Sequence, residues 1–104
     1  MSQLKLKNNV RPLSLVIAAA VINSANEMKL DTNVFITSGN DSKHMPGSKH
    51  YSNEALDVRS KNFNISIRNK LIKIINRRLG KNYQVIMEDD GKPNEHIHIE
   101  YDPK

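Results

Sequence analysis

The chain has 104 residues, of which 38% are hydrophobic and 26% charged, a composition that excludes a disordered or fibrous protein and leaves room for one modest core. It contains no cysteine, which excludes a disulfide framework and any thiolate metal site. Sixteen basic against eleven acidic side chains give a net charge of +5, which favours acidic partners or simply keeps a small protein in solution. We therefore expect residues 1–104 to form a single domain.

The first apolar run, at residues 13–22, follows a basic leader and has two interpretations. It has the order of a secretory signal, with basic residues, an apolar core and small residues. It also continues as an apolar stripe at helical spacing, which favours a helix at residues 12–29 with Pro12 in its first turn. We favour the helix and expect no signal peptide. The run is too short to cross a bilayer, so we expect no membrane association.

The rest of the chain alternates between strand and helix signals. Short segments rich in β-branched and aromatic residues predict strands at 34–37, 55–59, 83–88 and 96–101. A five-residue apolar stripe between Asn64 and Gly80 predicts a second helix, capped by the first of these residues and ended by the second. The order predicts an α+β domain: a small, mainly antiparallel sheet of about four strands with two helices on one face.

Two of the predicted strands place polar side chains opposite an apolar face. In residues 55–59, Leu56 and Val58 share one face of the strand, so Asp57 lies on the other. In residues 96–101, three apolar residues alternate with His96, His98 and Glu100. The sequence therefore predicts a polar site on the face of the sheet away from the helices.

The residue types on that face are those of a zinc site. Neutral imidazole and carboxylate are both good zinc ligands, and three of them leave a fourth position for a water molecule whose pKa falls to about 7. His50, in a long polar loop, joins Asp57 and His98 as a possible three-ligand set. Glu95 adds a carboxylate beside them that can transfer a proton, if it lies in the turn before the last strand.

This pattern resembles the zinc D-alanyl-D-alanine carboxypeptidases and the phage L-alanyl-D-glutamate endolysins, whose fold the hedgehog signalling domain shares. Ser48, His50 and Asp57 match the first part of the family signature, and Glu95 and His98 match the second. The resemblance covers about residues 34–102. It implies a hedgehog/DD-peptidase-like fold, one Zn²⁺ ion held by His50, Asp57 and His98, and Glu95 as the catalytic base.

The sequence departs from the family at its substrate-binding positions. The family usually carries an arginine just after a Ser-Gly pair, whereas Asn40-Asp41 follows Ser38-Gly39 here. Lys43 or Arg59 is the expected substitute, and His96 matches a histidine that lies beside the metal in some members. The residues expected to bind substrate are therefore Ser48, Arg59, His96 and Lys43.

The resemblance implies a zinc metallopeptidase that hydrolyses a peptide bond in the stem peptide of bacterial peptidoglycan, of carboxypeptidase or endolysin type. A short basic enzyme of this kind resembles a phage or prophage product, made in the cytoplasm and acting at the cell wall. We expect a monomer. The alternative is a non-catalytic, zinc-containing binding or virion-associated domain of the same fold. A nucleic-acid-binding protein is a third reading, which we do not favour because the few aromatic residues are not interleaved with basic ones.

Overall fold

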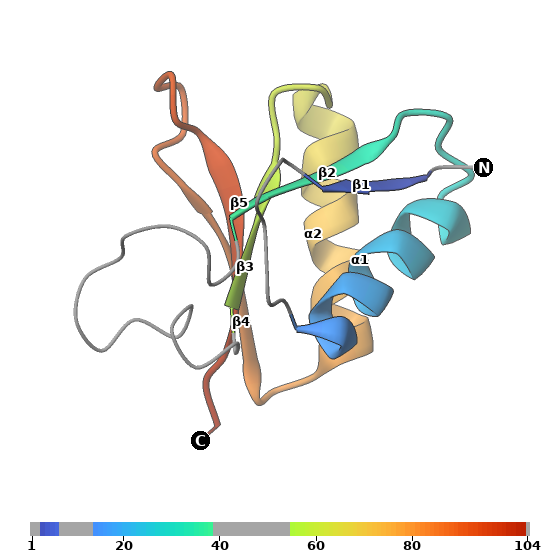
Figure 1. The fold of residues 1–104 in the computed structure, drawn as a ribbon, viewed down its shortest axis with the longest axis vertical. Coiled ribbons are helices and arrows are strands. Elements are labelled where there is room, and N and C mark those ends of the chain that lie inside the picture. Colours follow the sequence, from blue (N-terminus) through green and yellow to red (C-terminus); the bar gives the residue numbers. More distant parts are fainter. Residues whose placement is uncertain (1–2, 7–13, 39–54, 104) are drawn as a thin grey trace.

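The computed structural model describes residues 3–6, 14–38 and 55–103, which form one five-stranded sheet and two helices (Figure 1). The predicted residues His50, Ser48 and Lys43 lie outside the described residues. The elements in chain order are β1 (Leu4–Leu6), α1 (Leu15–Glu27), β2 (Val34–Ser38), β3 (Ala55–Arg59), α2 (Ile65–Leu79), β4 (Tyr83–Glu88) and β5 (His96–Tyr101).

The sheet has the strand order β1-β2-β3-β5-β4. β1 runs parallel to β2, and the other three neighbouring pairs are antiparallel. This confirms the α+β class and the mainly antiparallel sheet. The expected count of about four strands is one too low, because β1 has only three residues and is stabilised by pairing with a distant segment rather than by its own sequence pattern.

Both helices pack on one face of the sheet, as expected (Figure 1). The inward side chains of the strands alternate in sequence and are almost completely buried, and helices α1 and α2 cover them. Burial of each such side chain contributes about 1.5–3 kcal/mol. The strand and helix residues at the centre of this core are Ile17, Val21, Val34, Ile36, Leu56, Val58, Leu71, Ile75, Ile97 and Ile99.

Side-chain caps set the helix boundaries. Helix α1 begins at Leu15 rather than at residue 12, because Ser14 has extended backbone angles and its hydroxyl accepts a hydrogen bond from the Ile17 N–H. Asn64 caps α2 in the same way, and Gly80 ends it at a φ of +84°, as expected. Among the described helices, none is long and apolar enough to cross a membrane.

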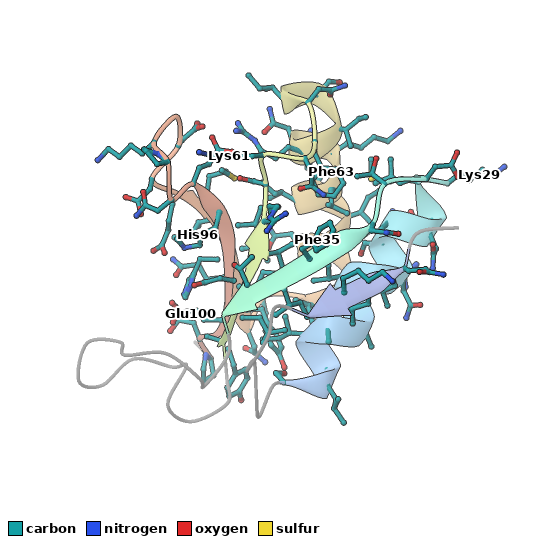
Figure 2. All side chains as sticks on the ribbon, turned by 45° about the horizontal axis from the view of Figure 1, so that its top comes forward. Lys29, Phe35, Lys61, Phe63, His96 and Glu100 are labelled. Carbon is teal, nitrogen blue, oxygen red and sulfur yellow. The ribbon has the colours of Figure 1, made fainter. Side chains whose placement is uncertain are left out.

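The opposite face of the sheet carries the polar residues of β3, β4 and β5. Figure 2 labels three side chains of this face, Phe35 of β2 and His96 and Glu100 of β5. The alternation that buries Ile97 and Ile99 against the helices therefore places the two histidines of β5 on the outer face.

Candidate metal centre

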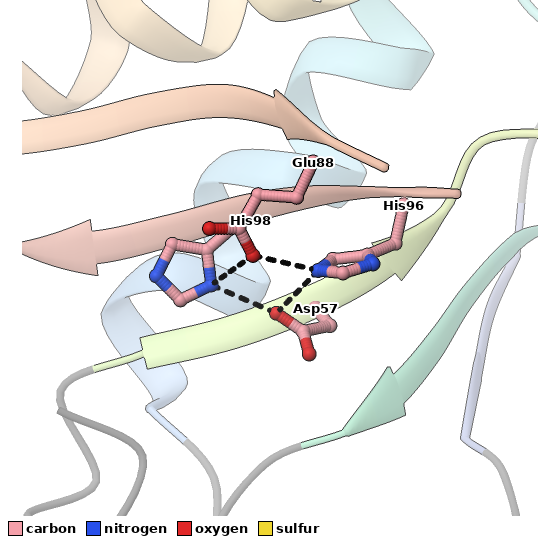
Figure 3. Close-up of side chains that lie close together, drawn as sticks. All are labelled: Asp57, Glu88, His96 and His98. Carbon is pink, nitrogen blue, oxygen red and sulfur yellow. Dashed lines mark hydrogen bonds and ion pairs between the residues drawn. The ribbon is translucent and has the colours of Figure 1, made fainter. Parts of the chain in front are cut away.

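Three adjacent strands bring four potential metal ligands together. β5 lies between β3 and β4, and the register pairs His98 directly with Asp57 and His96 directly with Glu88. His96 and His98 are two residues apart on one strand, so their side chains share a face. Figure 3 shows the four side chains converging from the three strands.

The donor atoms lie close enough together to share one ion. One ligand atom from each residue lies within 4.8 Å of all the others. His98 Nδ1 is 2.9 Å from Asp57 Oδ1, and His96 Nε2 is 2.9 Å from Glu88 Oε1. The diagonal distances are 3.6 Å from His96 Nε2 to Asp57 Oδ1 and 3.8 Å from His98 Nδ1 to Glu88 Oε1. Tetrahedral ligands about 2.1 Å from a zinc ion are about 3.4 Å apart, so these four atoms fit one ion with small shifts.

The outer nitrogen of each histidine is held by an acceptor. His98 Nε2 is 2.9 Å from Glu100 Oε1, and His96 Nδ1 is 2.8 Å from the Asn94 carbonyl oxygen. When the outer nitrogen donates its proton there, the inner nitrogen of the neutral ring keeps a lone pair directed at the donor set. Such outer hydrogen bonds fix the tautomer of most metal-binding histidines.

The same contacts shift the pKa of both histidines upwards. Burial lowers the pKa of His98, but hydrogen bonds to Asp57 and Glu100 outweigh it and raise the pKa from 6.5 to about 9. Burial also lowers the pKa of His96, while the Asn94 carbonyl and the charges of Asp57 and Glu88 raise it by more. The His98 ring therefore favours the protonated form at neutral pH when no metal is present, and the pKa of His96 shifts in the same direction.

Glu95 lies in the turn before β5, where the sequence prediction required it. Its carboxylate accepts hydrogen bonds from the Ser60 hydroxyl and the Gly91 N–H, and both bonds lower its pKa. It also lines a cavity of about 330 Å³ together with the donor residues Asp57 and His96. The Arg68 guanidinium of α2 lies 4.0 Å from the same carboxylate, so the contacts of the Glu95 carboxylate within the described residues are with Ser60, Gly91 and Arg68 rather than with the donor set.

Arg59 lines the same cavity. Its guanidinium lies over the Phe35 ring, 4.7 Å from the ring centroid, which holds the cation on the outer face of the sheet. Thr37 of β2 also lines the cavity and adds a hydroxyl. The cavity is therefore lined by two metal-capable residues, Asp57 and His96, together with Glu95 and the cation of Arg59.

The structure brings together Asp57 and His98, two of the three residues expected to bind zinc. His96, expected to contact substrate, supplies a donor atom of the same set. Glu88 was not predicted. The feature that could have identified Glu88 is its position at the end of the predicted strand 83–88. That strand pairs with 96–101 as a hairpin, which places Glu88 opposite His96. The role of His50 as a ligand remains a prediction.

Comparison of the chain with protein-family models, with curated proteins and with solved structures finds no match.

Proposed function

We propose that the chain is a zinc-dependent peptidase whose metal is held on the outer face of the sheet. The observation that carries the proposal is the convergence of Asp57, Glu88, His96 and His98, with the outer nitrogen of each histidine already engaged. Two imidazoles and two carboxylates suit zinc, although the same donors also bind other divalent metals.

The residues around the donor set have different proposed roles in peptide hydrolysis. A zinc ion bound there would polarise a substrate carbonyl and lower the pKa of a coordinated water molecule. The resemblance to the zinc carboxypeptidases assigns Glu95, whose lowered pKa keeps it ionised at neutral pH, the role of the base that would accept the proton of the attacking water and pass it to the leaving amine. Arg59 holds a negatively charged group of the substrate in the adjoining cavity.

The substrate we propose is the stem peptide of bacterial peptidoglycan, cleaved in the manner of a carboxypeptidase or an endolysin. The support for this substrate is the resemblance of His50, Asp57, Glu95 and His98 to the zinc carboxypeptidase signature. A cavity that places a cation beside the donor set suits a peptide with free carboxylates.

The test is cleavage of purified cell walls, followed by mass spectrometry of the released peptides. We expect new amino termini or free D-alanine with the zinc-loaded protein and none after chelation. Glu95→Gln should keep the metal and lose at least about 100-fold in rate, which is the contribution of a positioned acid–base group. Glu27→Gln, which removes an acid from α1, is the control and should cleave normally. Wild-type protein that carries zinc but releases nothing from any wall preparation would contradict the proposal.

A second candidate is a binding domain in which the metal is structural. The observation that favours it is the number of protein donors, because four protein ligands are typical of structural zinc sites whereas catalytic sites keep one position open. In that case zinc should stabilise the fold, while zinc-loaded protein should bind wall fragments without cleaving them.

A further inference from the structure

The four donors are not equivalent in their exposure to solvent. The side chains of Asp57, His96 and His98 are 14%, 18% and 12% exposed, whereas that of Glu88 is 43% exposed. The first three lie on β3 and β5, which have neighbours on both sides, and Glu88 is the last residue of the edge strand β4. Asp89, which follows it, has a φ of +54° and begins the turn. Of the four donors, Glu88 alone therefore lies on the edge strand and is substantially exposed to solvent.

Glu88 is also held by fewer contacts than either histidine. Each histidine is fixed at its outer nitrogen, by Glu100 or by the Asn94 carbonyl. Within residues 3–6, 14–38 and 55–103, the polar contacts of the Glu88 carboxylate are those with the two histidines, at 2.9 Å and 3.8 Å. Rotation of Glu88 into solvent would thus leave both outer hydrogen bonds of the histidines in place.

We infer that Glu88 is a displaceable ligand, which closes the metal site at rest and gives up its position to an oxygen atom of a substrate carbonyl or carboxylate. The inference rests on the proposed function, since it concerns the same metal. It also accounts for four protein donors in a site that must admit substrate. Asp57, His96 and His98 hold the ion throughout, and Glu88 controls access to the fourth position.

The test uses Co²⁺ in place of zinc, because its visible absorption reports its ligands without any assay of hydrolysis. Acetate serves as the probe for the fourth position. Glu88→Ala should bind Co²⁺ within about tenfold of wild type, whereas Asp57→Ala should weaken binding by more than the roughly 100-fold that loss of an outer partner costs. Acetate should bind Co²⁺-loaded Glu88→Ala at least about tenfold more tightly than wild type, because no side chain occupies the position.

Two further variants complete the experiment. Glu88→Gln keeps the size of the side chain but offers only a neutral, weaker ligand, so it should show part of the gain in acetate affinity. Gln84→Ala, on the same face of β4, should behave as wild type. If Glu88→Ala loses Co²⁺ as completely as Asp57→Ala, or if its acetate affinity is unchanged, the inference is wrong while the metal site stands. If wild type binds no Co²⁺, both the inference and the proposed function fail.

Discussion

Contacts of both ring nitrogens of His96 and His98 hold the candidate site together when no metal is bound. Each ring has an acceptor at both nitrogens: Asp57 and Glu100 for His98, and Glu88 and the Asn94 carbonyl for His96. A doubly protonated ring can donate to both acceptors, which is why both pKa values are raised. A metal ion would replace the two inner protons and leave the outer hydrogen bonds unchanged.

The stability of the metal-free protein should therefore depend on pH in the alkaline range. The pKa of His98 is about 9 in the folded protein and 6.5 by default, so the folded state binds the proton more tightly. The proton on His98 stabilises the folded state fully below pH 6.5. This contribution to the free energy of unfolding, of the order of 3 kcal/mol, is lost as the pH rises through 9. Urea unfolding between pH 6 and pH 10 in the presence of chelator measures it. His98→Gln is the control and should flatten the profile, and a wild-type profile that is already flat would show that His98 lacks these partners.

Glu100 is expected to act on the metal through His98 rather than as a ligand. Glu100→Gln keeps the shape of the side chain but offers only a neutral oxygen or an N–H group to His98 Nε2. We expect a 10–100-fold loss of zinc affinity, the usual effect of removing an outer partner, measured by competition with a chelating dye. Glu27→Gln should leave the affinity unchanged. An unaltered affinity in Glu100→Gln would mean that the ring is oriented without this hydrogen bond.

At the scale of elements, the strands with clear alternation could be predicted from the sequence. The segments 55–59, 83–88 and 96–101 match the observed strands; the first and last alternate between apolar and polar residues, and the second is rich in β-branched and aromatic residues and is followed by a turn. The alternation also predicts that His96 and His98 point away from the core. Both properties depend only on neighbouring residues.

The pairing and register of the strands could not be predicted from the sequence. Glu88 belongs to the site because β4 pairs with β5 in a register that sets it opposite His96. That register depends on packing across the whole sheet. Strand β1 was missed for the same reason, since three residues become a strand only beside β2. A prediction that treats each strand alone finds the histidines of β5 but misses Glu88 on the neighbouring strand β4.

The second helix provides a test at this scale. Asn64→Ala removes the acceptor for the Ile67 N–H at the start of α2 and should lower the free energy of unfolding by about 1 kcal/mol. The measurement is urea unfolding at neutral pH. Ser66→Ala, at an exposed position in the first turn, should change stability far less. Equal effects of the two substitutions would contradict the assignment of Asn64 as the cap.

Across the whole molecule, charge is divided between the two faces. Helix α2 contains five basic residues and no acidic one, and it covers the inner face of the sheet. The carboxylates of Asp57, Glu88 and Glu100 gather on the outer face around the two histidines. A basic protein thus presents a local concentration of negative charge where the two histidines of β5 converge, which favours a divalent cation there.

The measurement that tests this account most directly is the zinc content of the purified protein, determined by elemental mass spectrometry for wild type and for Asp57→Ala and His98→Ala. We predict one tightly bound zinc ion per wild-type chain and none in either variant, with all three proteins folded. Wild-type protein that takes up no divalent metal, or variants that keep as much zinc as wild type, would show that the four converging side chains are not a metal site.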